Sequence, residues 1–320
     1  MIGYYVHHVG RGHLSRAEAI VRELPEPVTV LSSLPRPDGW THGWVQLDRD
    51  DDGDPDNSAC PPLLHWAPLD HRGHQRRMAT IAGWIAAERP DVLVCDVSVE
   101  VTLLGRMLGV PVVTMVLPGD RRDEPHQLGF RAADAIVAPW PDLSPELCPG
   151  LGPHAAKVVH VGGISRFAGR SPDAPTGVRD AVLVLSGLGG AGVAAEYSLP
   201  ADLRVVRCGS DSWVEDPWPL LTTSAIVVSH CGLGALADIA TARRPAVLVP
   251  QPRPHDEQRR TAQALGAAGL AVINTEPRPD WNELIERARG LDPDRWTRWA
   301  APGAARRAAA VVVSVAERHA

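Results

Sequence analysis

Short apolar segments alternate with amphipathic stretches along nearly the whole chain, and this alternation constrains the fold more than any other feature. In the first half the apolar segments are Ile2–Val6, Val28–Leu31, Val92–Cys95, Val110–Val116, Ala135–Val137 and Val158–Val161. Helical stretches such as Ser15–Leu24 and His71–Glu88 lie between them, and in the latter the apolar residues recur at helical spacing on one face. The pattern is typical of parallel βαβ units, in which helices cover a parallel sheet.

The same alternation restarts in the second half of the chain. A segment rich in proline and glycine, residues 169–177, separates the halves and is interpreted as a linker. The apolar segments after it are Ala181–Ser186, Leu203–Cys208, Ala225–Val228, Ala246–Val249 and Leu270–Ile273. A chain of 320 residues exceeds what one core usually organises, so we expect two doubly wound α/β domains facing a central cleft. Open α/β sheets bind ligands at the carboxyl ends of their strands.

Composition excludes several classes of function. The net charge of −6 argues against a nucleic-acid partner, which requires a basic face. Five cysteines without CxxC spacing predict neither a disulfide framework nor a zinc site, and a reducing cytoplasm fits them. The chain opens without a secretory signal, and its longest apolar run, Ala308–Ala316, is too short to span a bilayer.

Each half has a glycine-rich turn directly after its first apolar segment. The first turn contains Gly10, Gly12 and Arg16, and the second contains Gly187, Gly189 and Gly190. Such turns bring backbone N–H groups close to a ligand, although tight packing between strand and helix is an alternative explanation. Neither turn matches a dinucleotide-binding fingerprint, because the first has no third glycine and the second no acidic residue at the required distance.

The segment from Ala225 to Ile273 contains several signals for a nucleotide-sugar site. A buried strand ends in Ser229-His230-Cys231-Gly232-Leu233-Gly234, where small residues let the chain turn into a helix. The free N–H groups at that helix start favour a diphosphate against Gly232, Gly234 and Ala235, with His230 beside it. After the next strand and a proline-rich loop, Asp256-Glu257-Gln258 provides carboxylate and amide groups suited to sugar hydroxyls.

This run resembles the donor-site signature of GT-B glycosyltransferases, in particular the group of the peptidoglycan N-acetylglucosamine transferase and the UDP-sugar glycosyltransferases. The resemblance implies that His230 and Gly232–Ala235 hold the diphosphate, that Asp238 binds the ribose, and that Glu257 and Gln258 hold the donor sugar. It also implies a base-binding role for Trp213 or Val214, with a packing role as the alternative for Trp213, and a diphosphate-binding role for the second glycine-rich turn. Asp238 is usually Glu in this family, and Thr261-Ala262 replaces the usual Asn-Ala.

The resemblance also implies a domain organisation. Residues 1–168 form an acceptor-binding Rossmann-like domain, residues 169–177 the linker, and residues 178–302 the donor-binding Rossmann-like domain. Residues 303–320 form a C-terminal helix that the family often folds back across the cleft to the first domain, and a solvated helix end is the alternative. The turn with Gly10, Gly12 and Arg16 is similar to the acceptor-side loop of the family.

His13 is the candidate general base. It follows the first strand in a glycine loop, and a neutral imidazole can take a proton from an acceptor hydroxyl at physiological pH. Asp96 ends another predicted strand and is expected to orient that imidazole, as in the His-Asp dyad of several GT-B enzymes. The alternatives are a packing role for His13 and a helix-capping role for Asp96.

No metal or cofactor is expected besides the donor substrate. Asp48–Gly53 matches only the first half of a calcium loop, since Ala59 replaces the required Glu, and we interpret it as a solvated loop. His65, Asp70, His71 and His74 lack zinc spacing with cysteines.

The expected function is an inverting, metal-independent cytoplasmic glycosyltransferase that moves a sugar from a UDP-sugar or related donor to a hydroxyl. The acceptor is a small molecule, a glycan or a lipid-linked compound, and contact with a membrane surface is compatible with the sequence. The alternatives are an NDP-sugar 2-epimerase or hydrolase on the same fold, and a non-catalytic glycosyltransferase-like partner protein.

Overall fold

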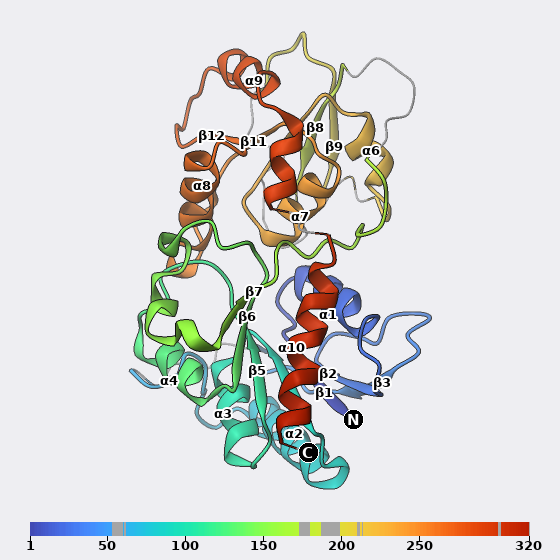
Figure 1. Cartoon of the computed structure of the whole chain (residues 1–320), viewed down its shortest axis with the longest axis vertical. Coiled ribbons are helices and arrows are strands. Elements are labelled where there is room, and N and C mark those ends of the chain that lie inside the picture. The colour runs from blue at the N-terminus through green and yellow to red at the C-terminus, as the bar shows by residue number, and fades with distance from the viewer. Residues whose placement is uncertain are drawn as a thin grey trace.

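The computed structural model contains two domains, each built on an all-parallel sheet, and confirms the predicted fold class (Figure 1). It describes residues 1–52, 60, 62–172, 180–186, 199–209, 212, 214–299 and 302–319. Glycines 187, 189 and 190, Trp213 and most of the predicted linker lie outside these ranges.

The first domain has a seven-stranded sheet with the order β3-β2-β1-β4-β5-β6-β7. Its strands are β1 (Ile2–Val6), β2 (Val28–Ser32), β3 (Gly43–Gln46), β4 (Val92–Asp96), β5 (Val112–Met115), β6 (Ala135–Ala138) and β7 (Val158–His160). Its helices are α1 (Arg11–Val21), α2 (Arg72–Glu88), α3 (Val99–Met107), α4 (Glu124–Ala132) and the 3₁₀ segments η1 (Pro145–Leu147) and η2 (Pro149–Lys157). The sequence patterns missed β3, because this edge strand is only partly buried and carries no apolar run.

The second domain has a five-stranded sheet with the order β12-β11-β10-β8-β9. Its strands are β8 (Val182–Leu185), β9 (Val205–Cys208), β10 (Ile226–Ser229), β11 (Ala246–Leu248) and β12 (Val272–Ile273). Its helices are α6 (Trp218–Thr223), α7 (Leu233–Thr241), α8 (Glu257–Ala267), α9 (Trp281–Arg289) and the 3₁₀ segments η4 (Pro254–Asp256) and η5 (Pro293–Arg298).

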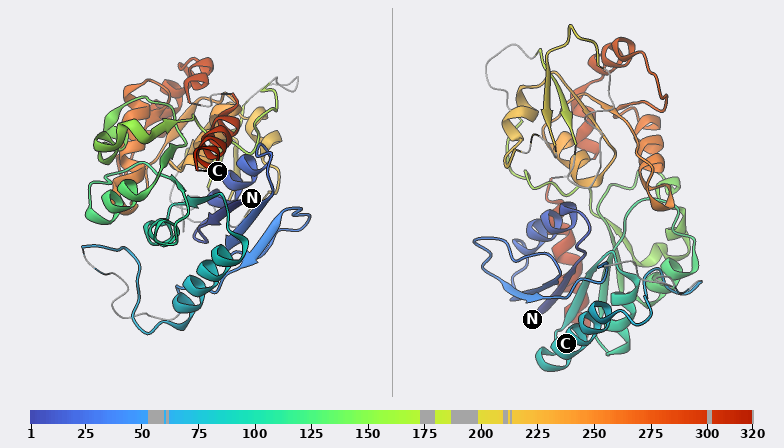
Figure 2. Two further views of the ribbon diagram at one scale, coloured as in Figure 1. Left: turned by 60° about the horizontal axis from the view of Figure 1, so that its bottom comes forward. Right: turned by 180° about the vertical axis from the view of Figure 1, so that it is seen from behind.

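The last helix, α10 (Ala304–Arg318), runs along the first domain beside α1 (Figures 1 and 2). Val312 and Val315 on α10 are buried in one cluster with residues of β1, β4 and β5.

The chain therefore crosses between the domains twice, and the two crossings are in contact. Gly163 donates its backbone N–H to the carbonyl of Trp299 at 2.7 Å. A Cβ at Gly163 would lie 2.9 Å from the Trp299 ring, so this close approach requires glycine.

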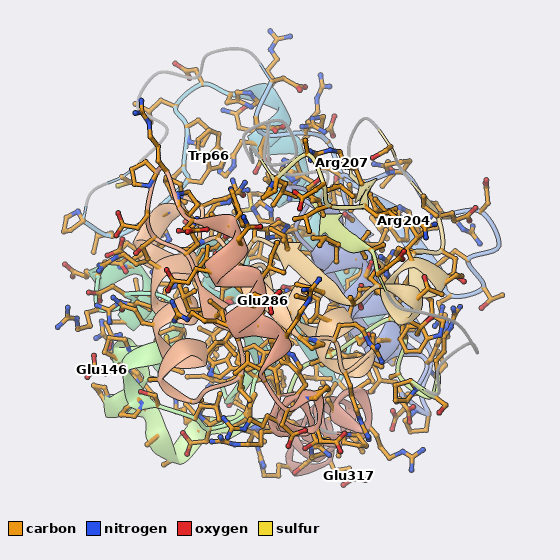
Figure 3. The ribbon with its side chains drawn as sticks, turned by 90° about the horizontal axis from the view of Figure 1, so that it is seen from above. Trp66, Glu146, Arg204, Arg207, Glu286 and Glu317 are labelled. Carbon is orange, nitrogen blue, oxygen red and sulfur yellow. The ribbon has the colours of Figure 1, made fainter. Side chains whose placement is uncertain are left out.

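Apolar packing is continuous from one domain into the other. One buried cluster contains Phe130 and Trp140 of the first domain together with Leu221 and Leu236 of the second. Charged side chains such as Arg204, Glu286 and Glu317 lie on the outside of the molecule (Figure 3). Among the described residues, no helix has the length and apolar character needed to cross a membrane.

Candidate functional site

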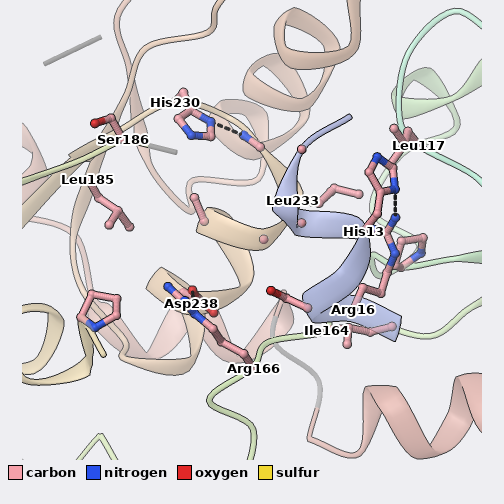
Figure 4. Close-up of a pocket in the computed structure, with 18 of the residues that line it drawn as sticks. His13, Arg16, Leu117, Ile164, Arg166, Leu185, Ser186, His230, Leu233 and Asp238 are labelled. Atoms are coloured by element: carbon pink, nitrogen blue, oxygen red, sulfur yellow. Dashed lines mark hydrogen bonds and ion pairs between the residues drawn. The ribbon is translucent and has the colours of Figure 1, made fainter. Parts of the chain in front are cut away.

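A cavity of about 280 Å³ lies between the two domains, and most of the predicted site residues that the structure describes line it (Figure 4). The residues from the first domain are Val9, Gly10, Gly12, His13, Ser15, Arg16, Leu117, Pro139, Ile164 and Arg166. The residues from the second domain are Leu185, Ser186, Cys208, Val214, Pro217, His230, Gly232, Leu233, Gly234, Ala235, Asp238, Arg253 and Glu257.

The structure brings His13 and Asp96 together, because β1 and β4 are neighbours in the sheet. Val6 at the end of β1 is paired with Asp96 at the end of β4, and α1 begins five residues after Val6, at Arg11. His13 therefore lies in the first turn of α1 and not in a loop. Its Nδ1 atom is 2.9 Å from Asp96 Oδ1. The tautomer that donates Nδ1–H to this carboxylate leaves Nε2 as a proton acceptor.

Arg16 forms a buried ion pair with Asp96, which the sequence analysis did not anticipate. Arg16 Nη2 donates to Asp96 Oδ1 at 2.6 Å, and Nε donates to Oδ2 at 3.2 Å. Burial raises the pKa of Asp96, but the charges of Arg16 and His13 outweigh it, and the net result is a pKa of about 2. Asp96 is therefore ionised at neutral pH, and Arg16 neutralises it. Arg16 Nη2 also lies 3.0 Å from His13 Nδ1, and because a guanidinium only donates, this contact is not a hydrogen bond in the tautomer that donates Nδ1–H to Asp96.

The N-terminus of α7 lines the cavity from the second domain. Gly232 precedes the helix, and the N–H groups of the first turn are the ones that an α-helix leaves without helical partners. His230 Nδ1 accepts the backbone N–H of Gly232 at 2.9 Å. A Cβ at Gly232 would lie 2.6 Å from the His230 ring, so the residue after Cys231 must be glycine.

His230 is neutral at physiological pH. Burial, with a smaller contribution from Arg253, lowers the pKa of its imidazole to about 4. Because Nδ1 accepts a hydrogen bond, the ring proton resides on Nε2, which makes His230 a neutral hydrogen-bond donor. A neutral donor beside free helix N–H groups is suited to a diphosphate.

Asp238 is held by two residues of the first domain that the sequence analysis missed. Its carboxylate accepts from Ser165 Oγ at 2.7 Å and from Arg166 Nε at 3.1 Å. Burial raises the pKa of Asp238 to about 6, although Arg166 and Ser165 oppose the rise. The sequence feature that could have indicated this contact is the polar pair Ser165-Arg166, which follows β7 at the carboxyl edge of the sheet.

Glu257 and Gln258 have different surroundings. Glu257 lines the cavity, and burial raises its pKa while Arg121, 3.8 Å away, lowers it. Gln258 is buried and does not line the cavity. Its Oε1 atom accepts the backbone N–H groups of Cys231 at 3.1 Å and Gln251 at 3.0 Å. Gln258 thus holds two loops together in the structure, and its contact with the donor sugar stays a prediction.

Residues 217–308 match the model of the glycosyltransferase family 28 C-terminal domain. Two curated relatives are UDP-N-acetylglucosamine–N-acetylmuramyl-(pentapeptide) pyrophosphoryl-undecaprenol N-acetylglucosamine transferases. The protein of Synechococcus sp. is 39% identical over 83 residues, 23% of this chain and 23% of that protein. The protein of Sorangium cellulosum is 27% identical over 208 residues, 54% of this chain and 49% of that protein. The chain thus matches 23% to 49% of the length of these relatives.

Solved structures match over the whole chain. MurG of Acinetobacter baumannii has a TM-score of 0.59 at 16% identity and covers 98% of this chain and 99% of its own. The glycotransferase of kitacinnamycin has a TM-score of 0.65 at 14% identity, with 98% of each chain covered.

The sheets and these matches assign the chain to the GT-B class of glycosyltransferase folds. Within that class it resembles MurG and the UDP-sugar transferases, and its C-terminal half carries the family 28 signature.

The raised pKa of Asp238 predicts a measurable pH effect on stability. A carboxyl group whose pKa is higher in the folded chain destabilises the fold when it is ionised there. The rise of the pKa from 3.8 to about 6 corresponds to a destabilisation of about 3 kcal/mol. This destabilisation is complete above pH 6 and is lost below about pH 4. We expect the free energy of unfolding of Asp238→Asn, relative to that of wild type, to increase by about 3 kcal/mol between pH 4 and pH 7.

Denaturant unfolding of both proteins at pH 4 and pH 7 measures this difference. The exposed Asp142→Asn serves as control, and a difference independent of pH would contradict the assignment.

Proposed function

We propose that the protein is an inverting glycosyltransferase that moves a sugar from a UDP-sugar, or a closely related donor, to a hydroxyl group. The observation that carries the proposal is that His13 of the first domain and the α7 N-terminus of the second domain line one cavity. A base and an anion site in one cavity are what an attack opposite a leaving diphosphate requires.

In the proposed reaction the acceptor hydroxyl gives its proton to Nε2 of His13. The acceptor oxygen then forms a bond to the anomeric carbon while the bond from that carbon to the diphosphate breaks, through a transition state with oxocarbenium character. The N–H groups of the first turn of α7, together with His230, stabilise the negative charge on the departing diphosphate. Asp96 orients the imidazole, and Arg16 positions Asp96.

The donor assignments follow the cavity lining. We propose that Asp238 binds the ribose, since each of its oxygens retains a lone pair beyond the bonds to Ser165 and Arg166. Val214 and Glu257 line the same cavity, and we propose that Val214 contacts the nucleobase and that Glu257 binds the donor sugar. A neighbour of the same fold, UGT89C1 of Arabidopsis thaliana, was crystallised with UDP, with a TM-score of 0.62 at 13% identity. The five cysteines are free, which fits a cytoplasmic enzyme.

The 2-epimerase alternative has less support. Among the described residues that line the cavity, the carboxylates are Asp238 and Glu257, and Asp238 is already paired with Arg166. Conversion of a UDP-sugar by the protein without any acceptor would favour that alternative.

Replacing the base is expected to impair turnover and not donor binding. In His13→Ala, turnover should fall by roughly 10² to 10⁴, the usual contribution of a positioned general base. The dissociation constant of the UDP-sugar should change little, because His13 belongs to the first domain and the proposed donor-binding residues belong to the second. Single-turnover product formation and isothermal titration measure the two quantities. Near wild-type turnover with saturating acceptor would show that His13 is a packing residue.

Two carboxylate variants should separate the nucleotide from the sugar. Asp238→Ala should weaken UDP and UDP-sugar alike, whereas Glu257→Ala should weaken only UDP-sugar. Wild-type protein should be stabilised by about 2.7 kcal/mol when UDP is present at a hundredfold excess over its dissociation constant. Thermal unfolding with each ligand reports the affinities, and equal losses for both ligands in both variants would refute these roles.

Transfer is proposed to proceed without a divalent ion at the diphosphate, because helix N–H groups and His230 occupy that position. Protein treated with EDTA should turn over at the same rate with and without added Mg²⁺ or Mn²⁺. Loss of turnover that either ion restores would overturn this part of the proposal.

A further inference from the structure

A second cluster of polar side chains lies outside the cavity, where the two domains meet. It consists of His65, Asp123, His126 and His255, and each offers one ligand atom within 4.8 Å of the others. His65 precedes α2 in the first domain, Asp123 and His126 lie at the start of α4, and His255 belongs to η4 of the second domain. No step of the proposed transfer uses these four side chains.

Asp123 is the centre of the cluster. Its carboxylate is 2.6 Å from His65 Nε2, 2.7 Å from His126 Nδ1 and 3.8 Å from His255 Nδ1. The three imidazoles also touch one another, with ring centroids 4.4 Å apart for His65 and His126 and 4.7 Å apart for His126 and His255. Three ring nitrogens and a carboxylate therefore converge on one point.

The backbone around the cluster is firmly held. Glu100 accepts the N–H groups of His65 and Trp66, which fixes the loop before α2. Asp120 donates its backbone N–H to the carbonyl of His255 across the domain boundary. A Cβ at Gly119 would lie 2.6 Å from that carbonyl oxygen, so glycine is required for the two loops to approach this closely. His255 itself has a left-handed backbone, with φ of 59°.

We propose that His65, Asp123, His126 and His255 bind one transition-metal ion of the zinc class, which links the two domains. Imidazole nitrogens with one carboxylate are suited to zinc, copper, iron or nickel, and not to magnesium or calcium. In a tetrahedral zinc site with bonds of about 2.0 to 2.1 Å, neighbouring ligand atoms are about 3.4 Å apart. Shifts of about 1 Å or less would close the present cluster around such an ion.

The cluster is accessible to an ion, and a metal ion binds the uncharged form of an imidazole. An open hollow beside Asp123 and His255 connects the cluster with solvent. Binding through Nδ1 of His126 places the ring proton on Nε2, so Arg121, now 3.2 Å from Nε2, must withdraw from that contact.

The position of the cluster gives the ion a structural consequence. His255 is two residues before Glu257, which lines the cavity. An ion bound by His255 and by three residues of the first domain would fix the loop that carries Glu257 relative to the acceptor side. It would act away from the diphosphate, so the metal independence of the transfer step is a separate question.

The experiment uses full-length protein stripped with EDTA and returned to chelator-free buffer. Titration with ZnCl₂ should show one ion per chain, and the ion should raise Tm. Co²⁺ in place of Zn²⁺ should give the intense visible absorption of tetrahedral Co²⁺. His255→Asn and His65→Ala should weaken Zn²⁺ binding by at least about tenfold. Asn is chosen because it tolerates the left-handed backbone at position 255.

The control is His42→Ala, which removes a histidine outside the cluster and should bind Zn²⁺ like wild type. Stabilisation of each stripped variant by UDP shows that it is folded and tests the donor site independently. Absence of stoichiometric Zn²⁺ binding by wild type, or equal binding by both cluster variants and wild type, would overturn the proposal. Zn²⁺ binding without a rise in Tm would overturn the link between the domains.

Discussion

The buried carboxylate of Asp96 is the group on which the arrangement of the acceptor side depends. A fully buried charge is stable only with a compensating partner, and Arg16 provides it through two hydrogen bonds from the second turn of α1. Because α1 follows β1 directly and β1 is paired with β4, this contact fixes how α1 sits at the carboxyl edge of the sheet. His13, three residues before Arg16, is thereby held against the same carboxylate and on the cavity wall. The ion pair and the candidate base are thus parts of one network.

The second domain is joined to this network by polar contacts from several loops. Ser165 and Arg166 hold Asp238, Arg121 lies beside Glu257, and the backbone of Asp120 meets that of His255. Each contact joins a residue of the proposed donor site, or a close neighbour of one, to the first domain. Donor binding and the relative position of the domains are therefore expected to be coupled, since a ligand that changes the surroundings of Asp238 also changes an interdomain bond.

Within the donor domain, the small residues around position 232 serve packing as much as binding. Gly232 is required because the His230 ring occupies the space of a side chain there, and Gln258 ties the same turn to the loop at Gln251. The His-Cys-Gly element and the Gln after Glu257 therefore form one scaffold. This explains why they occur together in the sequence although only some of these residues reach the cavity.

The sequence by itself determined the two doubly wound domains, the strands that carry apolar runs and the candidate pair of His13 and Asp96, because periodicity and the residues at strand ends are local properties. It failed at β3, whose edge position leaves it without an apolar run. Only the tertiary structure decided which partners Asp96, Asp238 and Gln258 have, because those contacts join residues up to 80 positions apart in the chain. The same is true of the cluster of His65, Asp123, His126 and His255. Its members have no metal-binding spacing along the chain and converge only where the two domains pack together.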